Sequence, residues 1–155
     1  MTATRILRKT RKGFTLVEIL IVVIILGILA AIVIPQFTNA SQDARRSALA
    51  STVQSVRSQI ELYKLQHGDT LPDLVTSWAP FTGTTTYGGT TFGPYMQSAP
   101  ENQLQNNSAA VKNGTAVVAG DTQGFVYDYG AAGVGSGRFW GIDKSTTGAL
   151  SLLGD

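Results

Sequence analysis

Residues 12–35 read KGFTLVEILIVVIILGILAAIVIP, and this stretch decides how the chain folds. The run from Ile19 to Ile34 holds sixteen residues without a charge, and Glu18 is the one charged side chain between Phe14 and Ile34. As an α-helix, the 21 residues from 14 to 34 would be about 31 Å long, which matches the hydrocarbon core of a bilayer. The sequence therefore predicts one membrane-spanning helix near the N-terminus.

A strongly basic segment precedes this apolar run. Five of the twelve Lys and Arg residues lie in the first twelve positions, whereas mixed charge follows the run at Asp43, Arg45 and Arg46. Because cytoplasmic flanks are enriched in Lys and Arg, we expect a single pass through a membrane, with the N-terminus in the cytoplasm and the rest of the chain outside. The alternative is a secretory signal peptide, whose apolar region of about 7 to 15 residues ends at a small-residue site, but here residues 32–34 continue the run.

The composition after residue 13 narrows the classes of function. Seven Lys and Arg face ten Asp and Glu there, a balance of about −3. Nucleic-acid binding needs a basic face on the folded domain, so no nucleic-acid partner is expected. The sequence has no Cys, which excludes disulfides and thiolate metal sites, and its one histidine, His67, falls at a predicted helix end. We therefore expect no catalytic residues and no enzyme activity.

Beyond Pro35 apolar residues continue to recur with the helical period, and polar residues lie between them. An apolar stripe recurs at spacings of three and four residues and comprises Leu49, Val53, Val56, Ile60 and Tyr63. The pair His67-Gly68, with Pro72 shortly after, is typical of a helix C-terminus. We therefore predict a helix from Phe14 to about His67.

The rest of the chain predicts a small sheet. From Asp69 to Asn113 we expect an ordered connecting region with one short helix or strand, whose aromatic residues pack on the stripe. Four short β-prone runs follow, separated by turns that favour antiparallel pairing: Thr115–Ala119, Gly124–Tyr129, Arg138–Ile142 and Ala149–Leu153. The stretch Gly133 to Gly137 is interpreted as a hairpin connection. The predicted fold class is α+β, with a long N-terminal helix packed on a C-terminal antiparallel sheet.

Residues 12–35 resemble the N-terminal signature of type IV pilins and type II secretion pseudopilins, a basic leader ending in Gly before Phe-Thr-Leu-Val-Glu. The segment Glu61–Leu65 with Pro72 is similar to the helix end of major pseudopilins. This resemblance covers roughly residues 12–74, and beyond it 93–95 and 99–102 resemble the stretch before the pseudopilin sheet. It implies a leader peptide at 1–13, a membrane and filament-core helix at 14–35, an amphipathic helix at 36–68 and the connecting region and sheet at 69–155.

The resemblance also implies roles for single residues. A prepilin peptidase would cut between Gly13 and Phe14 and N-methylate Phe14, while Gly13 could instead be a flexible hinge. A carboxylate within a bilayer costs about 2.5 to 3.5 kcal/mol, so Glu18 is expected to pair with the Phe14 amine of a neighbouring subunit, or else to lie at the interface as a snorkelling side chain. Gly27 and Pro35 would let the helix between them melt on assembly, or only kink it.

Major pseudopilins carry a calcium site in an acidic C-terminal loop. The candidates here are Asp121, Asp128 and Asp143, with Asp155 at the end of the sequence. They are dispersed, so we expect solvated carboxylates and no metal or other cofactor, with calcium as the alternative.

The function expected from the resemblance is that of a major pseudopilin, a subunit of a periplasmic type II secretion fibre that drives protein export. The expected partners are further copies in a helical homopolymer, the prepilin peptidase, an inner-membrane assembly platform, minor pilins or pseudopilins, and the lipid bilayer. The nearest alternative is a major or minor subunit of a surface type IV pilus for adhesion, motility or DNA uptake. A membrane-tethered periplasmic enzyme or binding module is the third.

Overall fold

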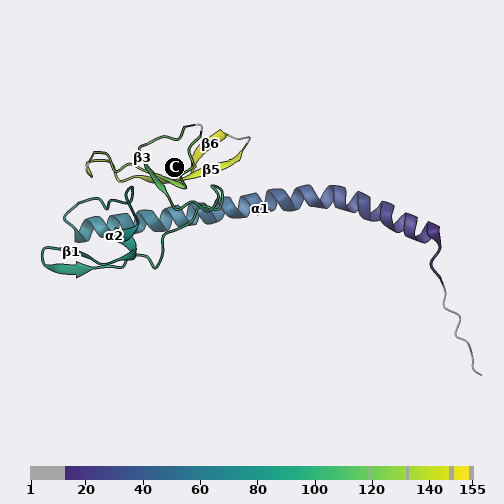
Figure 1. Ribbon diagram of the computed structural model, residues 1–155, viewed down its shortest axis with the longest axis horizontal. Helices are drawn as coiled ribbons and strands as arrows, with labels where there is room; N and C mark the ends of the chain where they lie inside the picture. The colour runs from purple at the N-terminus through teal and green to yellow at the C-terminus, as the bar shows by residue number, and fades with distance from the viewer. Residues whose placement is uncertain (1–12, 119, 132, 147–148, 154–155) are drawn as a thin grey trace, which may run out of the picture. The chain divides into compact units, whose positions relative to one another are not determined.

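The computed structural model describes residues 13–118, 120–131, 133–146 and 149–153 (Figure 1). Residues 1–12 of the predicted leader, which comprises residues 1–13, lie outside this range, as does Asp155. The elements are, in chain order, α1 (Leu16–Gln66), α2 (Ala79–Thr82), β1 (Thr85–Tyr87), β2 (Thr90–Phe92), β3 (Val111–Asn113), β4 (Phe125–Tyr127), β5 (Phe139–Thr146) and β6 (Ala149–Leu153). The chain divides into two compact units at Ala40 and Ser41, and each is described by itself.

The first unit contains the apolar part of α1. All its side chains from Gly13 to Ala40 are exposed, including every Ile, Leu and Val of the run. The helix continues through Pro35, and the hydroxyl of Thr38 donates to the carbonyl of Ile34 at 3.2 Å. The prediction of a helix starting at Phe14 is therefore confirmed to within two residues.

The second unit has its core between α1 and a four-stranded sheet. The predicted stripe is confirmed, because Leu49, Val53, Val56 and Ile60 are buried, and Tyr63 packs against the same cluster. The aromatic side chains of the loops and strands complete this cluster, and they are Phe81, Phe125, Tyr127 and Phe139 in its centre with Trp78 and Tyr95 at its margin. Burying side chains of this size contributes about 1.5 to 3 kcal/mol each, so this cluster holds the second unit together.

The C-terminus of α1 is built as the sequence predicts. Gly68 has a φ of +61°, and the amide of Asp69 donates to the carbonyl of Lys64 at 2.9 Å, which is the long-range bond of a Schellman motif. His67 is buried, stacks on Tyr63 with 3.9 Å between ring centroids, and has its Nε2 2.9 Å from the hydroxyl of Thr85. The histidine therefore fixes the helix end to the segment that begins β1.

The strand order of the main sheet is β3-β4-β5-β6. The β4–β5 and β5–β6 pairs are antiparallel, as predicted, and the stretch 133–137 joins β4 to β5. The β3–β4 pair is parallel, so the sheet is mixed rather than wholly antiparallel. The chain returns between these two strands over residues 114–124, which lets both run in the same direction.

The predicted strand at Thr115–Ala119 is wrong in position. Residues 115–118 form no strand, Ala119 lies outside the described residues, and the strand is Val111–Asn113 instead. Val111 is buried against the core, whereas Val118 is 57% exposed. Both segments have β-prone residues, so core burial decides which one pairs.

A two-stranded hairpin of β1 and β2 lies in the connecting region, where the sequence predicted one short helix or strand. Its register pairs Thr85 with Phe92 and Tyr87 with Thr90, and its turn is Gly88-Gly89, both with positive φ. Two glycines at this position allow the tight turn that matches strand twist. The region therefore contains a short helix and a hairpin, where the sequence predicted only one short helix or strand.

One contact between α1 and the sheet is unusually close. A Cβ added at Gly141 in β5 would lie 2.8 Å from side-chain atoms of Leu49 in α1. Glycine therefore lets the helix approach the strand backbone at this point.

The buried hydroxyl of Tyr127 has no hydrogen-bond partner among the described residues, and burial raises the pKa of this phenol. An unpaired buried hydroxyl lowers stability, so Tyr127→Phe should change the free energy of unfolding by less than about 1 kcal/mol or raise it. The matched variant is Tyr95→Phe, which removes a 2.7 Å hydrogen bond to Gln66 and should cost about 0.5 to 1.5 kcal/mol.

Both variants can be compared by urea unfolding of the full chain in detergent. Trp78 and Trp140, the two tryptophans of the sequence, both lie in the second unit and report its unfolding by fluorescence. A loss above about 2 kcal/mol for Tyr127→Phe would mean that the hydroxyl has a partner after all, such as a buried water.

Candidate assembly site at the head of the N-terminal helix

Thr15 and Glu18 form a reciprocal cap at the start of α1. The backbone amide of Thr15 donates to a carboxylate oxygen of Glu18 at 2.8 Å, and the amide of Glu18 donates to the Thr15 hydroxyl at 3.2 Å. The hydroxyl of Thr15 also donates to the same carboxylate at 2.8 Å. This is a capping box, which the sequence analysis missed although Thr-Leu-Val-Glu has the required spacing.

The cap gives Glu18 a local role in addition to the predicted one. Its carboxylate accepts from the backbone amide and the hydroxyl of Thr15, and a negative charge at this position also suits the helix dipole. The residue is exposed within its unit, so the carboxylate is open to further partners. Pairing with a neighbouring amine stays a prediction, and the cap already holds the carboxylate at the helix head where such a pair would form.

Gly13 and Phe14 lie before the first turn, in a segment without helical structure. Among the described residues, no atom other than those of Gly13 and its chain neighbours lies within 4 Å of the position that a Cβ of Gly13 would take, and Phe14 is 84% exposed. The bond between them is therefore unobstructed. This arrangement is what a peptidase needs, and cleavage at this bond stays a prediction.

The exposed apolar surface follows directly behind the cap. Leucine, isoleucine and valine side chains from Leu16 to Ile34 are between 40% and 81% exposed. α1 is the helix long and apolar enough to cross a membrane among the described residues. Gly27 has open space around it, and Pro35 lies within the helix. The helix is intact between these two residues, and its melting on assembly stays a prediction.

The candidate calcium ligands are not brought together. Asp121 accepts from Lys112 at 2.7 Å, the Asp128 carboxylate accepts from the Ser136 hydroxyl at 2.6 Å, and Asp143 pairs with Arg46 at 2.9 Å. Within the described ranges there is no group of three or more His, Cys, Asp or Glu side chains that could hold a metal ion.

The hydrogen bonds to two of these aspartates predict how pH affects stability. The Lys112 ammonium lowers the pKa of Asp121, and the Ser136 hydroxyl lowers the pKa of Asp128. Because these pKa values are lower in the folded state, each contributes stability above the unfolded value of about 3.9 and loses it as pH falls further.

Chelation of calcium should change the melting temperature of the full chain in detergent only slightly, because each carboxylate already has a protein donor. The measurement is thermal unfolding with calcium and with excess chelator, followed by tryptophan fluorescence. A large calcium-dependent rise would contradict the prediction, and Asp121→Asn and Asp128→Asn would then identify the ligand.

Comparisons with known proteins find similarity in the N-terminal part of the chain. The prokaryotic N-terminal methylation motif matches residues 8–34. The type II secretion system core protein G of Pseudomonas aeruginosa is 38% identical over 60 residues, covering 39% of this chain and 42% of that protein. The core protein G of Klebsiella michiganensis is 37% identical over 60 residues, with the same coverage of both chains.

Type IV pilins are also similar to this chain, over about as many residues as core protein G. The type IV major fimbrial protein FimA of Dichelobacter nodosus is 46% identical over 55 residues, covering 36% of this chain and 35% of that protein. No solved structure was found that matches the chain. The chain thus matches about two-fifths of the length of the first of these curated relatives. The chain therefore carries the N-terminal methylation motif, and its N-terminal part is similar to core protein G and to type IV pilins.

Proposed function

We propose that the chain is a structural subunit of a type II secretion pseudopilus, polymerising through its N-terminal helix into a periplasmic fibre that drives protein export. The observation that carries this proposal is the exposed apolar part of α1, which begins with the capped carboxylate of Glu18. The similarity to core protein G supports the choice of system.

The physical reason is the cost of exposing this surface to water. Burying one Leu, Ile or Val side chain contributes about 1.5 to 3 kcal/mol, and the run holds more than a dozen of them. Such a helix stays in a bilayer or among copies of itself. The proposed subunit is therefore anchored by this helix in the inner membrane, with its folded unit in the periplasm, and moves from the membrane into a helical homopolymer.

Processing would prepare the subunit for this transfer. The proposed partners are the prepilin peptidase, an inner-membrane assembly platform and minor pseudopilins. Removal of residues 1–13 would place a new amine at Phe14, close in sequence to Glu18. Mass spectrometry of the membrane-bound protein should then give a mature chain beginning at methylated Phe14, and a chain that keeps Met1 in assembled fibres would contradict this.

A surface type IV pilus is the second candidate, because FimA and the narrow pilus component PilA5 of Thermus thermophilus are 46% and 40% identical to this chain over 55 residues. Deleting the gene and imaging the cells separates the two. A pseudopilin deletion should trap exported proteins in the periplasm and leave surface fibres intact. Loss of long extracellular fibres with normal secretion would support the pilus instead.

A further inference from the structure

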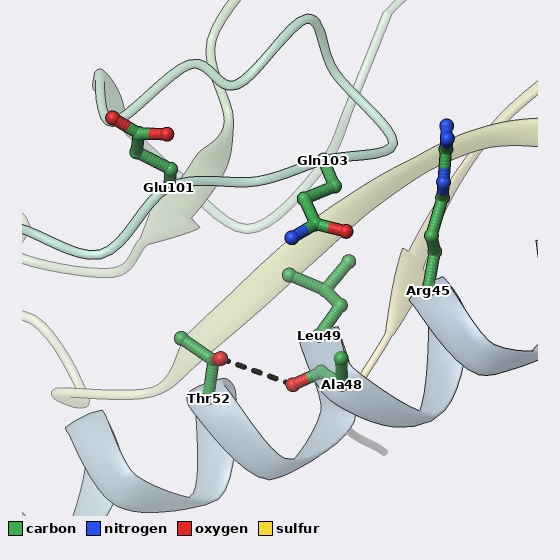
Figure 2. A pocket seen from close by; sticks show the side chains of 6 residues that line it. All are labelled: Arg45, Ala48, Leu49, Thr52, Glu101 and Gln103. Carbon is green, nitrogen blue, oxygen red and sulfur yellow. Dashed lines mark hydrogen bonds between the residues drawn. The ribbon is translucent and has the colours of Figure 1, made fainter.

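A polar groove lies in the second unit, where the early part of its helix faces the 103–106 loop and the strand β5. Its volume is about 330 Å³, and it is lined by Gln42, Arg45, Gln103, Leu104, Asn106 and Lys144. A smaller hollow of about 50 Å³ adjoins it and shares Arg45 and Gln103. Figure 2 shows this hollow, with Gln103 over Leu49 and with Arg45 and Glu101 on opposite sides.

The groove holds two cations without an acidic partner. Arg45 and Lys144 are exposed and make no ion pair with any described residue, whereas the adjacent Arg46 pairs with Asp143 at 2.9 Å. No carboxylate lines the larger groove, and Glu101 lines only the smaller hollow beside it.

The other lining groups suit the same kind of ligand. The amide side chains of Gln42, Gln103 and Asn106 add hydrogen-bond donors around the two cations. A guanidinium and an ammonium with surrounding amides form the donor set that recognises a phosphate. The groove therefore offers more donors than a single carboxylate can use, and it suits an anion with several oxygen atoms.

The sequence position of the groove indicates where that anion comes from. Gln42 and Arg45 follow Ile34, the last residue of the apolar run, by eight and eleven positions. Eleven helical residues are about three turns, or about 16 Å, so the covalent connection keeps Arg45 close to the bilayer surface however the two units are oriented. Headgroups lie directly outside the hydrocarbon core, and an anionic surface attracts Lys and Arg within about one Debye length.

We propose that this groove binds the phosphate of an anionic phospholipid, with Arg45 and Lys144 as its cations, while the subunit is anchored in the membrane. This inference rests on the proposed membrane anchor. The bound headgroup holds the folded unit at the bilayer surface, and polymerisation must release it. The lipid contact therefore adds to the work of extracting a subunit.

The test uses the full chain in neutral phosphatidylcholine bilayers, with or without about 30% phosphatidylglycerol. The readout is the rate at which an amine-directed reagent modifies Lys144, measured by mass spectrometry relative to Lys112, which is paired with Asp121. Phosphatidylglycerol should slow the modification of Lys144 about threefold or more. Arg45→Gln should remove this protection, and the matched control Lys64→Gln, which deletes one charge elsewhere on α1, should keep it.

The other outcomes overturn the proposal in distinguishable ways. Equal rates in both bilayers, or protection that survives Arg45→Gln, would exclude lipid binding. Equal protection by inorganic phosphate in neutral bilayers would make the groove a site for free phosphate. Protection that depends on protein density alone would indicate a second copy. A chain that fails to float with neutral vesicles would overturn the membrane anchor and the lipid contact with it.

Discussion

Fibres should not form from the Glu18→Gln variant, although the chain still inserts into the membrane and loses its leader. The proposed reason is charge, because Gln keeps the shape of the side chain but would leave the Phe14 ammonium of a neighbouring subunit buried without the counter-charge that we expect from Glu18. Breaking one buried pair in this way costs about 3 to 5 kcal/mol. The cost recurs at every subunit, so polymerisation should fail altogether.

The Glu18→Gln substitution should remove the charge without removing the capping box. Gln at the third helical position still closes a capping box with Thr15, so the start of α1 should be preserved. Glu18→Ala removes the cap and the charge together and serves as the comparison. Electron microscopy of the variant expressed alone and with the native chain measures fibre formation, and gel mobility measures leader removal. Normal fibres from Glu18→Gln alone would refute the pairing.

Asn102→Ala should destabilise the second unit more than any exposed substitution in its loop. The Asn102 side-chain amide donates to the carbonyls of Gly124 and Ile142 at 2.6 Å and 2.7 Å, and its oxygen accepts from the amide of Leu104 at 2.9 Å. The residue is fully buried. Removing these three bonds should lower the free energy of unfolding by about 2 to 4 kcal/mol, measured by urea and tryptophan fluorescence.

Two further variants serve as comparisons for Asn102→Ala. Gln103→Ala changes an exposed neighbour in the same loop and should stay within about 0.5 kcal/mol of the native chain. Asn102→Asp would place a carboxylate against two carbonyl oxygens, so its folded-state pKa should rise. Stability should then be highest below the unfolded value of about 3.9 and fall as pH rises. A loss from Asn102→Ala no larger than that from Gln103→Ala would show that the three bonds contribute little.

The sequence predicts the helical half of the molecule well because its signals are local. The stripe from Leu49 to Ile60 has the helical period, and Gly68 supplies the positive φ that ends α1. Three of the four predicted strands also overlap observed ones. Each of these features depends on residues within a few positions of one another.

The predictions that were wrong or missing mostly concern features that depend on contacts between residues far apart in the sequence. Val111, and not Val118, reaches the core, and only the packed structure shows this. Asn102 is important because it reaches Gly124 and Ile142, 22 and 40 positions away. The hairpin around Gly88-Gly89 and the cap of Thr15 and Glu18 had local signals that could have been recognised. The cations Arg45 and Lys144 become neighbours only through folding.

The close approach of Leu49 to Gly141 links the evolution of two distant positions. A methyl group at 141 would meet the Leu49 side chain at 2.8 Å, so a larger residue at 141 requires Leu49 to shift or to become smaller. Among related chains, a larger residue in the strand should therefore accompany Ala or Val on the helix. The double variant Gly141→Ala/Leu49→Val should likewise be more stable than the sum of its single changes predicts. Such covariation would reveal, from sequences alone, which face of the helix rests on the sheet.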